Sequence, residues 1–428
     1  MIMFIKKNIT ILALFIPLFT AAQSQFDDYS LESLTTTAEY GEGERQSNAQ
    51  NSLAIRYNTG TKGAPLNPTK AVYWFKRSAQ NGNKYAMNNL AYAYLNGKGI
   101  DKDVTMAAYW MEESAKKYYP SAALTIGKWY YYGTYVAQDY RKAARYLKDA
   151  AFGGIAEAMF YYGWCFAYGQ GESANYDKAN FWAHRAIDNE YYAAYELLGD
   201  MYQYGKTVNV DAYQAKRYYE LGAEKNILSC MVELGNIYLT DLLGEKDPQK
   251  ATEYYVSAAN QGSTAAMEKL GDLYFYTEYG LDDLSTAAYW YQKSFDIDIA
   301  SSSTDRLVRI YRYLEKYDAA ARVYQKMVDA GDTNAMNELA YLYADGKGVQ
   351  KDYNMALTLI DKAISSDPGD ANYLDSKGEI LLKKGDVKGA TKIWKKINSS
   401  FPLYYQQYSK EHDGEKTNLD EYMSKNAK

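Results

Sequence analysis

The sequence predicts an all-α protein, an α/α superhelical solenoid of about ten helix-turn-helix repeats of about 36 residues. Two observations support this fold class. An alanine recurs at six intervals of 36 residues, followed by intervals of 34, 35 and 34. Four residues before nearly every alanine stands an Asp or Asn, the residue types that cap helix N-termini. The alanines are Ala71, Ala107, Ala143, Ala179, Ala215, Ala251, Ala287, Ala321, Ala356 and Ala390.

The segment Ala335 to Ala363 shows how one repeat is built. Leu339 and Leu342 belong to an apolar stripe with helical spacing, which predicts a first helix of about three turns. This helix is expected to end at Gly346, because glycine readily adopts the left-handed conformation found just past helix ends. Asp352 is expected to cap a second helix. Such a pair has an apolar face that only the next repeat can cover.

The same register runs through the whole array. The predicted caps of the second helices are Asn67, Asp103, Asp139, Asn175, Asp211, Asp247, Asp283, Asp352 and Asp386, with Tyr317 replacing the cap in the eighth repeat. Three residues after the alanine, the expected core rings are Trp74, Trp110, Tyr146, Trp182, Tyr218, Tyr254, Trp290 and Tyr324. The small position of the first helices, where two helices should approach closely, holds Ala54, Ala91, Gly127, Gly163, Gly199, Gly235, Gly271, Val308, Ala340 and Gly378.

Composition excludes several classes of protein. The 428 residues include 48 tyrosines and only 7 prolines, which is far too aromatic for a disordered chain and suits helices. The net charge of -5 offers no basic surface on which to expect nucleic acid.

The N-terminal segment 1–22 resembles a secretory signal peptide. Lys6 and Lys7 precede an apolar stretch, and small residues end at Ala22, so cleavage is expected before Gln23. The alternative is an uncleaved membrane anchor, but the apolar run is shorter than the ~20 residues that a span needs. Loss of both lysines takes the net charge from -5 to -7. We therefore expect an exported protein, periplasmic or secreted, with no membrane span after signal removal.

The remaining sequence divides into three parts. Residues 23–47 are polar and predict a flexible or capping lead-in, residues 48–400 form the repeat array, and residues 401–428 form a polar C-terminal cap or tail.

Residues with catalytic or metal-binding chemistry are scarce. The only histidines are His184 and His412, and no cysteine cluster accompanies them, so we assign no catalytic, metal or cofactor residue. Cys165 and Cys230 lie two repeats apart, which places them ~20 Å from each other, whereas a disulfide needs Cα atoms within ~7 Å. Both are expected to be buried free thiols.

The repeats resemble the Sel1-like repeat, a member of the tetratricopeptide superfamily, over residues 48–400. The resemblance rests on the residues above and on the turn Gly97-Lys98-Gly99-Ile100, which has a near copy at Gly346-Lys347-Gly348-Val349. The eighth and tenth repeats lack this turn and resemble the plain tetratricopeptide form. Because the Gly-x-Gly turn recurs by position and lacks a following Lys-Ser or Lys-Thr, we interpret it as a turn and not as a phosphate loop.

The resemblance implies that the first helices line a concave face. Outward positions there form a groove of aromatic rings and amides, which suits an extended peptide or a glycan. The alternative is that these rings only stack on one another across repeats. The predicted partner-binding residues are Asn88, Tyr92, Lys128, Tyr131, Tyr132, Phe160, Trp164, Tyr168, Glu196, Asp200 and Tyr204.

The resemblance also implies a function. Sel1-like proteins commonly act as adaptors, so we expect a non-enzymatic scaffold that binds a protein or peptide in the concave groove. One alternative is a binder of cell-wall polymer or glycan. Another is a β-lactam-hydrolysing or penicillin-binding enzyme, but Sel1-like proteins of that kind carry paired cysteines in each repeat, and this chain does not.

Overall fold

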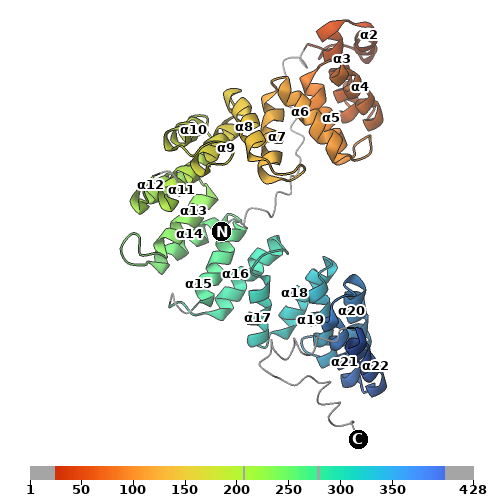
Figure 1. Ribbon diagram of the computed structural model, residues 1–428, viewed down its shortest axis with the longest axis vertical. Coiled ribbons are helices and arrows are strands. Elements are labelled where there is room, and N and C mark those ends of the chain that lie inside the picture. Colours follow the sequence, from red (N-terminus) through yellow and green to blue (C-terminus); the bar gives the residue numbers. More distant parts are fainter. Residues whose placement is uncertain (1–24, 206–207, 277–279, 401–428) are drawn as a thin grey trace. The chain divides into compact units, whose positions relative to one another are not determined.

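The computed structural model describes residues 25–205, 208–276 and 280–400. All regular structure in these residues is α-helical, which confirms the all-α repeat fold (Figure 1). The chain forms two units, residues 1–246 and 247–428, which we describe separately. The signal peptide and C-terminal tail predicted from the sequence, and His412 within that tail, lie outside the described residues.

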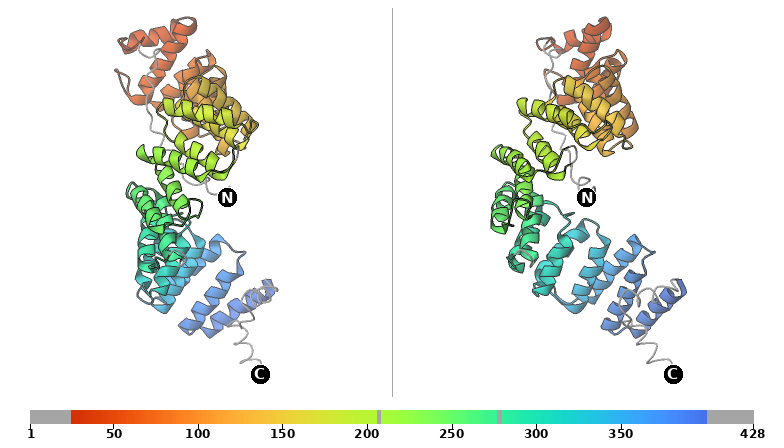
Figure 2. Two further views of the ribbon diagram at one scale, coloured as in Figure 1. Left: turned by 90° about the vertical axis from the view of Figure 1, so that its left-hand side faces the viewer. Right: turned by 60° about the vertical axis from the view of Figure 1, so that its left-hand side comes forward.

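Unit 1 is a succession of helices in which each packs against the next (Figures 1 and 2). Odd-numbered helices from α3 onward are the first helices of repeats, and even-numbered helices from α4 onward are the second. The helices are α2 (Leu31–Tyr40), α3 (Gly43–Thr59), α4 (Pro68–Gln80), α5 (Lys84–Asn96), α6 (Val104–Lys116), α7 (Pro120–Tyr132), α8 (Tyr140–Phe152), α9 (Ala156–Tyr168), α10 (Tyr176–Asp188), α11 (Ala194–Tyr204), α12 (Ala212–Glu224) and α13 (Leu228–Tyr238).

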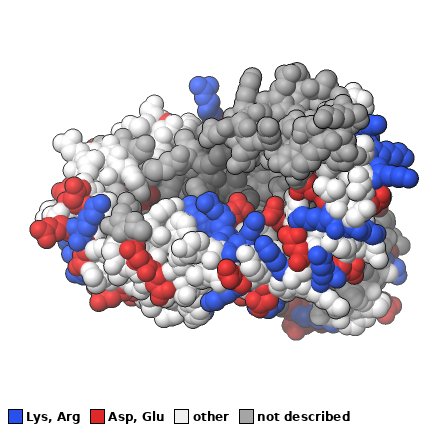
Figure 3. Space-filling view, turned by 90° about the horizontal axis from the view of Figure 1, so that it is seen from below, with Lys and Arg blue, Asp and Glu red and all other residues white. Residues whose placement is uncertain are grey.

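Unit 2 continues the same alternation. Its helices are α14 (Pro248–Asn260), α15 (Thr264–Phe275), α16 (Leu284–Ile297), α17 (Thr304–Tyr313), α18 (Tyr317–Asp329), α19 (Thr333–Asp345), α20 (Tyr353–Ser366), α21 (Ala371–Lys384) and α22 (Val387–Ser400). On the face drawn in Figure 3, Lys and Arg side chains are interspersed with Asp and Glu side chains.

The caps of the second helices form as the sequence predicts. The Asp103 carboxylate accepts a hydrogen bond from the backbone N–H of Met106 at 2.9 Å, and Asp352 accepts from Met355 N–H at 3.0 Å. In the eighth repeat, α18 begins after Lys316 without a side-chain cap, as expected from Tyr317. These bonds satisfy N–H groups that the first turn leaves unpaired.

The two helices of a repeat approach most closely where the small position meets a ring. In the fifth repeat, a Cβ on Gly199 of α11 would collide with the Tyr219 ring of α12, which is fully buried. The same collision would arise between Gly271 and Tyr291 in the seventh repeat. Glycine is therefore required at these positions for close helix packing rather than for backbone flexibility.

The lead-in is helical and packs on the first repeat. α2 contacts α3, and the side chains of Leu34 and Ala38 are fully buried between them. The buried Arg56 guanidinium donates to the carbonyl oxygens of Phe26 at 2.6 Å and Tyr29 at 2.8 Å, which ties the start of the described chain to α3. α3 begins at Gly43, earlier than the register of the repeats suggested.

The two cysteines follow the sequence prediction. Cys165 and Cys230 are free and buried, which confirms that the two thiols are unpaired. His184 is exposed on α10, and its Nδ1 lies 3.0 Å from the Asn180 carbonyl oxygen.

Within the described part of the chain, every helix is too short or too polar to cross a membrane.

Trp182 provides a test of the packing. Its indole is only 6% exposed and makes edge contacts with Phe152 and Tyr162. We expect Trp182→Ala to lower the free energy of unfolding by ~3 to 5 kcal/mol, measured by thermal and chemical denaturation. Tyr213→Ala, which removes a ring that is 68% exposed on α12, is the control and should change stability by less than ~0.5 kcal/mol. Equal melting temperatures for the two variants would show that Trp182 is not part of the core.

Candidate functional site

The first helices of neighbouring repeats meet in the middle of unit 1. α11 contacts both α9 and α13, whereas second helices of neighbouring repeats are in sparser contact across the described residues of this unit. Neighbouring repeats therefore contact each other through their first helices at α9, α11 and α13. We call the outward side chains of α5, α7, α9, α11 and α13 the first-helix surface.

The sequence-predicted residues of α7 join those of α9 through tyrosines. The hydroxyls of Tyr132 and Tyr161 lie 3.0 Å apart, and the Tyr131 ring is 5.9 Å from the Tyr161 ring. Lys128 pairs with Glu157 at 2.5 Å, and its ammonium also lies over the Tyr161 ring at 5.2 Å. Neighbouring repeats are therefore bonded through the side chains that the sequence analysis assigned to a partner.

Tyr131 and Phe160 are more enclosed than the sequence analysis expected. They are 9% and 8% exposed, and the Tyr131 hydroxyl donates to Gln170 Oε1 at 2.5 Å. The resemblance gave these two positions as outward, but the neighbouring turn and rings cover them. These two rings support the first-helix surface and offer little area of their own.

The rings along α9 form the most continuous part of the first-helix surface. Trp164 stacks on Tyr168 with centroids 4.7 Å apart and planes 17° apart, and Phe160 packs edge-on against Trp164 at 5.5 Å. Trp164, Tyr168 and Tyr132 are half-buried, so each presents part of its ring. At the other end, Tyr92 of α5 is half-buried and its hydroxyl lies 3.4 Å from Thr125 Oγ1. Asn88 is also half-buried on α5.

Beyond Tyr168 the surface becomes acidic. Asp200 accepts hydrogen bonds from the Tyr168 hydroxyl at 3.0 Å and from the Tyr219 hydroxyl at 2.7 Å. Glu196 accepts from the Ser229 hydroxyl at 2.8 Å, and the Tyr204 hydroxyl lies 3.4 Å from Glu233 Oε2. We call Glu196, Asp200 and Glu233 the acidic cluster. Among the described residues, no Lys or Arg forms an ion pair with any of the three.

Burial and mutual repulsion disfavour charge in this cluster. Burial, with the nearby Glu196 carboxylate, raises the pKa of Asp200 from 3.8 to about 8. Burial also raises the pKa of Glu196, and Glu233 adds to the rise. The pKa values of Tyr168 and Tyr219 are raised by burial, so both hydroxyls keep their protons and act as donors. The cluster is therefore a place where added positive charge would be strongly favoured.

The sequence analysis missed Tyr161, Tyr219 and Glu233. Tyr161 and Glu233 both stand two residues before the small position of their first helix. The sequence analysis did not include this repeat position among the outward ones. Tyr219 stands four residues after the recurring alanine, where spacing indicates only core. Its hydroxyl reaches Asp200 because α11 and α12 approach so closely at Gly199.

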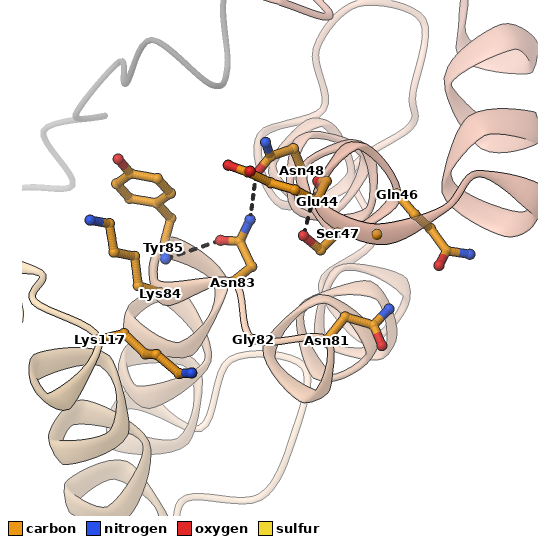
Figure 4. Close-up of a pocket in the computed structure, with 11 residues that line it drawn as sticks. Glu44, Gln46, Ser47, Asn48, Asn81, Gly82, Asn83, Lys84, Tyr85 and Lys117 are labelled. Atoms are coloured by element: carbon orange, nitrogen blue, oxygen red, sulfur yellow. Dashed lines mark hydrogen bonds between the residues drawn. The ribbon is translucent and has the colours of Figure 1, made fainter.

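A separate polar pocket of about 480 Å³ lies near the start of unit 1 (Figure 4). Asn83 caps α5 and donates from Nδ2 to Asn48 Oδ1 at 2.7 Å, so part of the pocket wall is already hydrogen-bonded to itself. We assign this pocket no function. It is lined by Gly43, Glu44, Gln46, Ser47, Asn48, Asn81, Gly82, Asn83, Lys84, Tyr85 and Lys117.

The raised pKa of Asp200 predicts a pH-dependent stability. The folded protein keeps Asp200 protonated up to about pH 8, whereas the unfolded chain releases this proton above pH ~4. The stability that the bound proton contributes is therefore lost as the pH rises through about 8. We expect the melting temperature to fall by roughly 5 °C between pH 6 and pH 9. The titratable groups that face Asp200 are Tyr168 of α9, Glu196 and Tyr204 of α11, Tyr219 of α12, and Cys230 and Glu233 of α13.

Asp200→Asn is the control for this prediction. An Asn amide can accept from Tyr219 and donate to Tyr168, so the variant should fold and should lose most of the fall. The same pH dependence in both proteins would show that Asp200 is not responsible.

No curated protein matches the chain. A solved Sel1 repeat protein from Oxalobacter formigenes is 28% identical, with 57% of this chain and 98% of that chain covered and a TM-score of 0.45. The protective antigen c5321 of uropathogenic Escherichia coli is 25% identical, with 92% and 93% covered and a TM-score of 0.37. A putative Sel1 repeat protein from Klebsiella pneumoniae is 19% identical, with 49% and 99% covered and a TM-score of 0.30.

The pattern of the Sel1 repeat itself matches most of the array. Between the matches, the eighth repeat is left out, and no match follows residue 368, in agreement with the resemblance of the eighth and tenth repeats to the plain tetratricopeptide form. The matched residues are 47–83, 84–119, 120–151, 156–191, 193–227, 228–263, 264–296 and 333–368. These matches cover more than half of the sequence, and the chain belongs to the Sel1 repeat family.

Proposed function

We propose that this protein is an exported, non-enzymatic scaffold that holds an extended segment of a partner protein along the first-helix surface of unit 1. The observation that carries the proposal is the run of contacting rings from Tyr132 of α7 through Tyr161 and Phe160 to Trp164 and Tyr168 of α9, in which every ring except Phe160 is half-buried. The run leads directly to the acidic cluster, because Tyr168 donates to Asp200.

The family supports the general class of function. Sel1 repeats generally mediate protein binding, and the family is generally non-catalytic. Among the described residues, no group of three His, Cys, Asp or Glu side chains is placed to hold a metal ion. The choice of surface and the kind of partner segment are our own proposal.

The geometry suits an extended segment better than a compact ligand. Rings that are held by neighbouring rings lose little entropy when a partner covers them, so their contact area contributes favourably to binding. The rings also alternate with hydroxyls and carboxylates, which can accept or donate hydrogen bonds along a peptide backbone. A segment spanning α7 to α11 would contact side chains from three consecutive repeats.

Export is proposed from the sequence of residues 1–22. The segment combines Lys6 and Lys7, an apolar stretch and small residues at its end, the order that signal peptides require. N-terminal sequencing of the protein recovered from its native cells should begin at Gln23. A protein that begins at Met1 in the cytoplasm would contradict export without affecting the proposed binding surface.

Removal of Trp164 tests the binding surface. Purified protein is immobilised and exposed to cell-envelope extract, and captured proteins are quantified by mass spectrometry. We expect Trp164→Ala to reduce capture of specific partners by about tenfold, because truncation of a central ring often costs 1 to 2 kcal/mol or more.

The matched control is Tyr109→Ala, which removes a ring that is 51% exposed on the second helix α6. It should leave capture unchanged, and thermal melts confirm that both variants fold. Equal capture by Trp164→Ala and the unaltered protein would contradict the proposed surface. Retention on cell-wall polymer, with no protein captured, would support the glycan-binding alternative instead.

A further inference from the structure

The fifth and seventh repeats contain the same constellation of side chains. Asp200 and Asp272 each follow the small position, and the tyrosines Tyr204 and Tyr276 stand four residues after these aspartates. Each aspartate accepts a hydrogen bond from a tyrosine of its own second helix. The unit 2 repeat can therefore be compared, residue by residue, with the unit 1 repeat.

In unit 2 this constellation includes an arginine. Tyr291 donates to Asp272 Oδ1 at 2.6 Å, and Arg306 Nη1 of the next first helix, α17, lies 3.1 Å from the same oxygen. The Arg306 guanidinium also lies 5.9 Å from the centre of the Tyr276 ring. The aspartate is thus neutralised by a guanidinium held against a tyrosine ring.

In unit 1 the corresponding arginine is replaced by an acid. Arg306 stands two residues before the small position of α17, and Glu233 occupies that position in α13. The surrounding sequences align, because Leu234 and Leu307 follow directly and both are fully buried.

The tyrosines of the two constellations are equally accessible. Tyr204 is 38% exposed and Tyr276 is 40% exposed. Unit 1 therefore keeps the aspartate and the ring that hold a guanidinium in unit 2, but offers a carboxylate where unit 2 offers the cation.

Three carboxylates that have no cationic partner among the described residues are energetically unfavourable. Asp200 is 8% exposed, and Glu196 and Glu233 are half-buried beside it, so none is fully hydrated. Protonation can relieve part of this cost, in agreement with the raised pKa of Asp200. A bound cation would relieve it while keeping the carboxylates ionised.

We propose that the acidic cluster of Glu196, Asp200 and Glu233 binds an arginine side chain of the partner segment, beside the Tyr204 ring. This inference rests on the proposed function, since the segment must reach the cluster along the first-helix surface. Arginine fits better than lysine because its planar guanidinium can contact two carboxylates and a ring at once. Arg306 in unit 2 shows that a guanidinium can occupy the equivalent position.

The proposal can be tested with defined peptides in place of the unidentified partner. The probe is the heptapeptide acetyl-Gly-Tyr-Gly-Arg-Gly-Tyr-Gly-amide, and binding to the full mature chain is followed by NMR and calorimetry. Versions with lysine or neutral citrulline replace the arginine. We expect the arginine peptide to bind at least about tenfold tighter than the citrulline peptide. The preference should grow from pH 6 to pH 9, because Asp200 ionises over this range.

Glu233→Arg is the decisive variant, because it rebuilds in unit 1 the arginine that unit 2 already has. It should abolish the preference for the arginine peptide and raise the melting temperature. The control is Glu224→Arg, which makes the same charge change at an exposed site on α12 and should keep the preference. Equal binding of arginine and citrulline peptides, or an unchanged preference in Glu233→Arg, would overturn the proposal.

Two further variants separate the possible failures. If Trp164→Ala abolishes binding while arginine and citrulline peptides bind the unaltered protein equally, the scaffold function stands and the arginine site does not. If the arginine preference is lost in Glu233→Arg but Trp164→Ala changes neither peptide binding nor partner capture, the arginine site stands and the proposed surface does not.

Lys206 lies outside the described residues, so Lys206→Gln is included. Arginine-dependent binding that appears only in this variant would mean that the chain's own lysine fills the cluster, and would overturn the proposal.

Discussion

The contact between a glycine of the first helix and a tyrosine ring of the second helix determines much of the structure of the fifth and seventh repeats. Gly199 allows α11 and α12 to approach until the Tyr219 ring lies against the α11 backbone, and Gly271 does the same for Tyr291. The contact buries a large ring completely in a single repeat. It also carries the tyrosine hydroxyl to the next residue of the first helix, which is an aspartate in both repeats. The packing that makes the repeat thereby also positions a carboxylate, which is buried in the fifth repeat and partly exposed in the seventh.

That carboxylate links the fold to the surface chemistry. An aspartate bonded only to tyrosine hydroxyls still lacks a counter-charge, and the fifth and seventh repeats differ in how they meet this. In unit 2, the next repeat supplies Arg306, so the aspartate is satisfied within the chain. In unit 1, the next repeat supplies Glu233, and burial with the nearby Glu196 carboxylate raises the pKa of Asp200 to about 8, so Asp200 holds a proton instead. Because the two repeats use the same tyrosine and aspartate positions, the difference lies in one residue and not in the fold.

Local features were predictable from the sequence, and contacts between repeats were not. The predictions that Asp103 and Asp352 cap helices were correct, because each carboxylate accepts a hydrogen bond from an N–H group only three residues away. The outward positions of Trp164 and Tyr168 were expected from the resemblance to tetratricopeptide arrays, and both rings are half-buried. The burial of Tyr131 could not follow from spacing, since its cover comes from Gln170 in the turn after α9. The relation of Glu233 to Asp200 depends on how α13 packs on α11, which no single-repeat pattern contains.

The retention of an acidic cluster in a packed repeat suggests why the surface is built this way. A buried charge without a partner is rarely the most stable solution, and the arrangement with Arg306 shows that this fold can accommodate a stabilising alternative. Stability alone would therefore favour a cation at the position of Glu233. An acid there makes sense if the missing charge is brought by another molecule, because the energy lost in the free protein is recovered on binding. The same argument explains the location of the cluster, at the end of a run of half-buried rings, where an arriving segment would contact the rings and the carboxylates together.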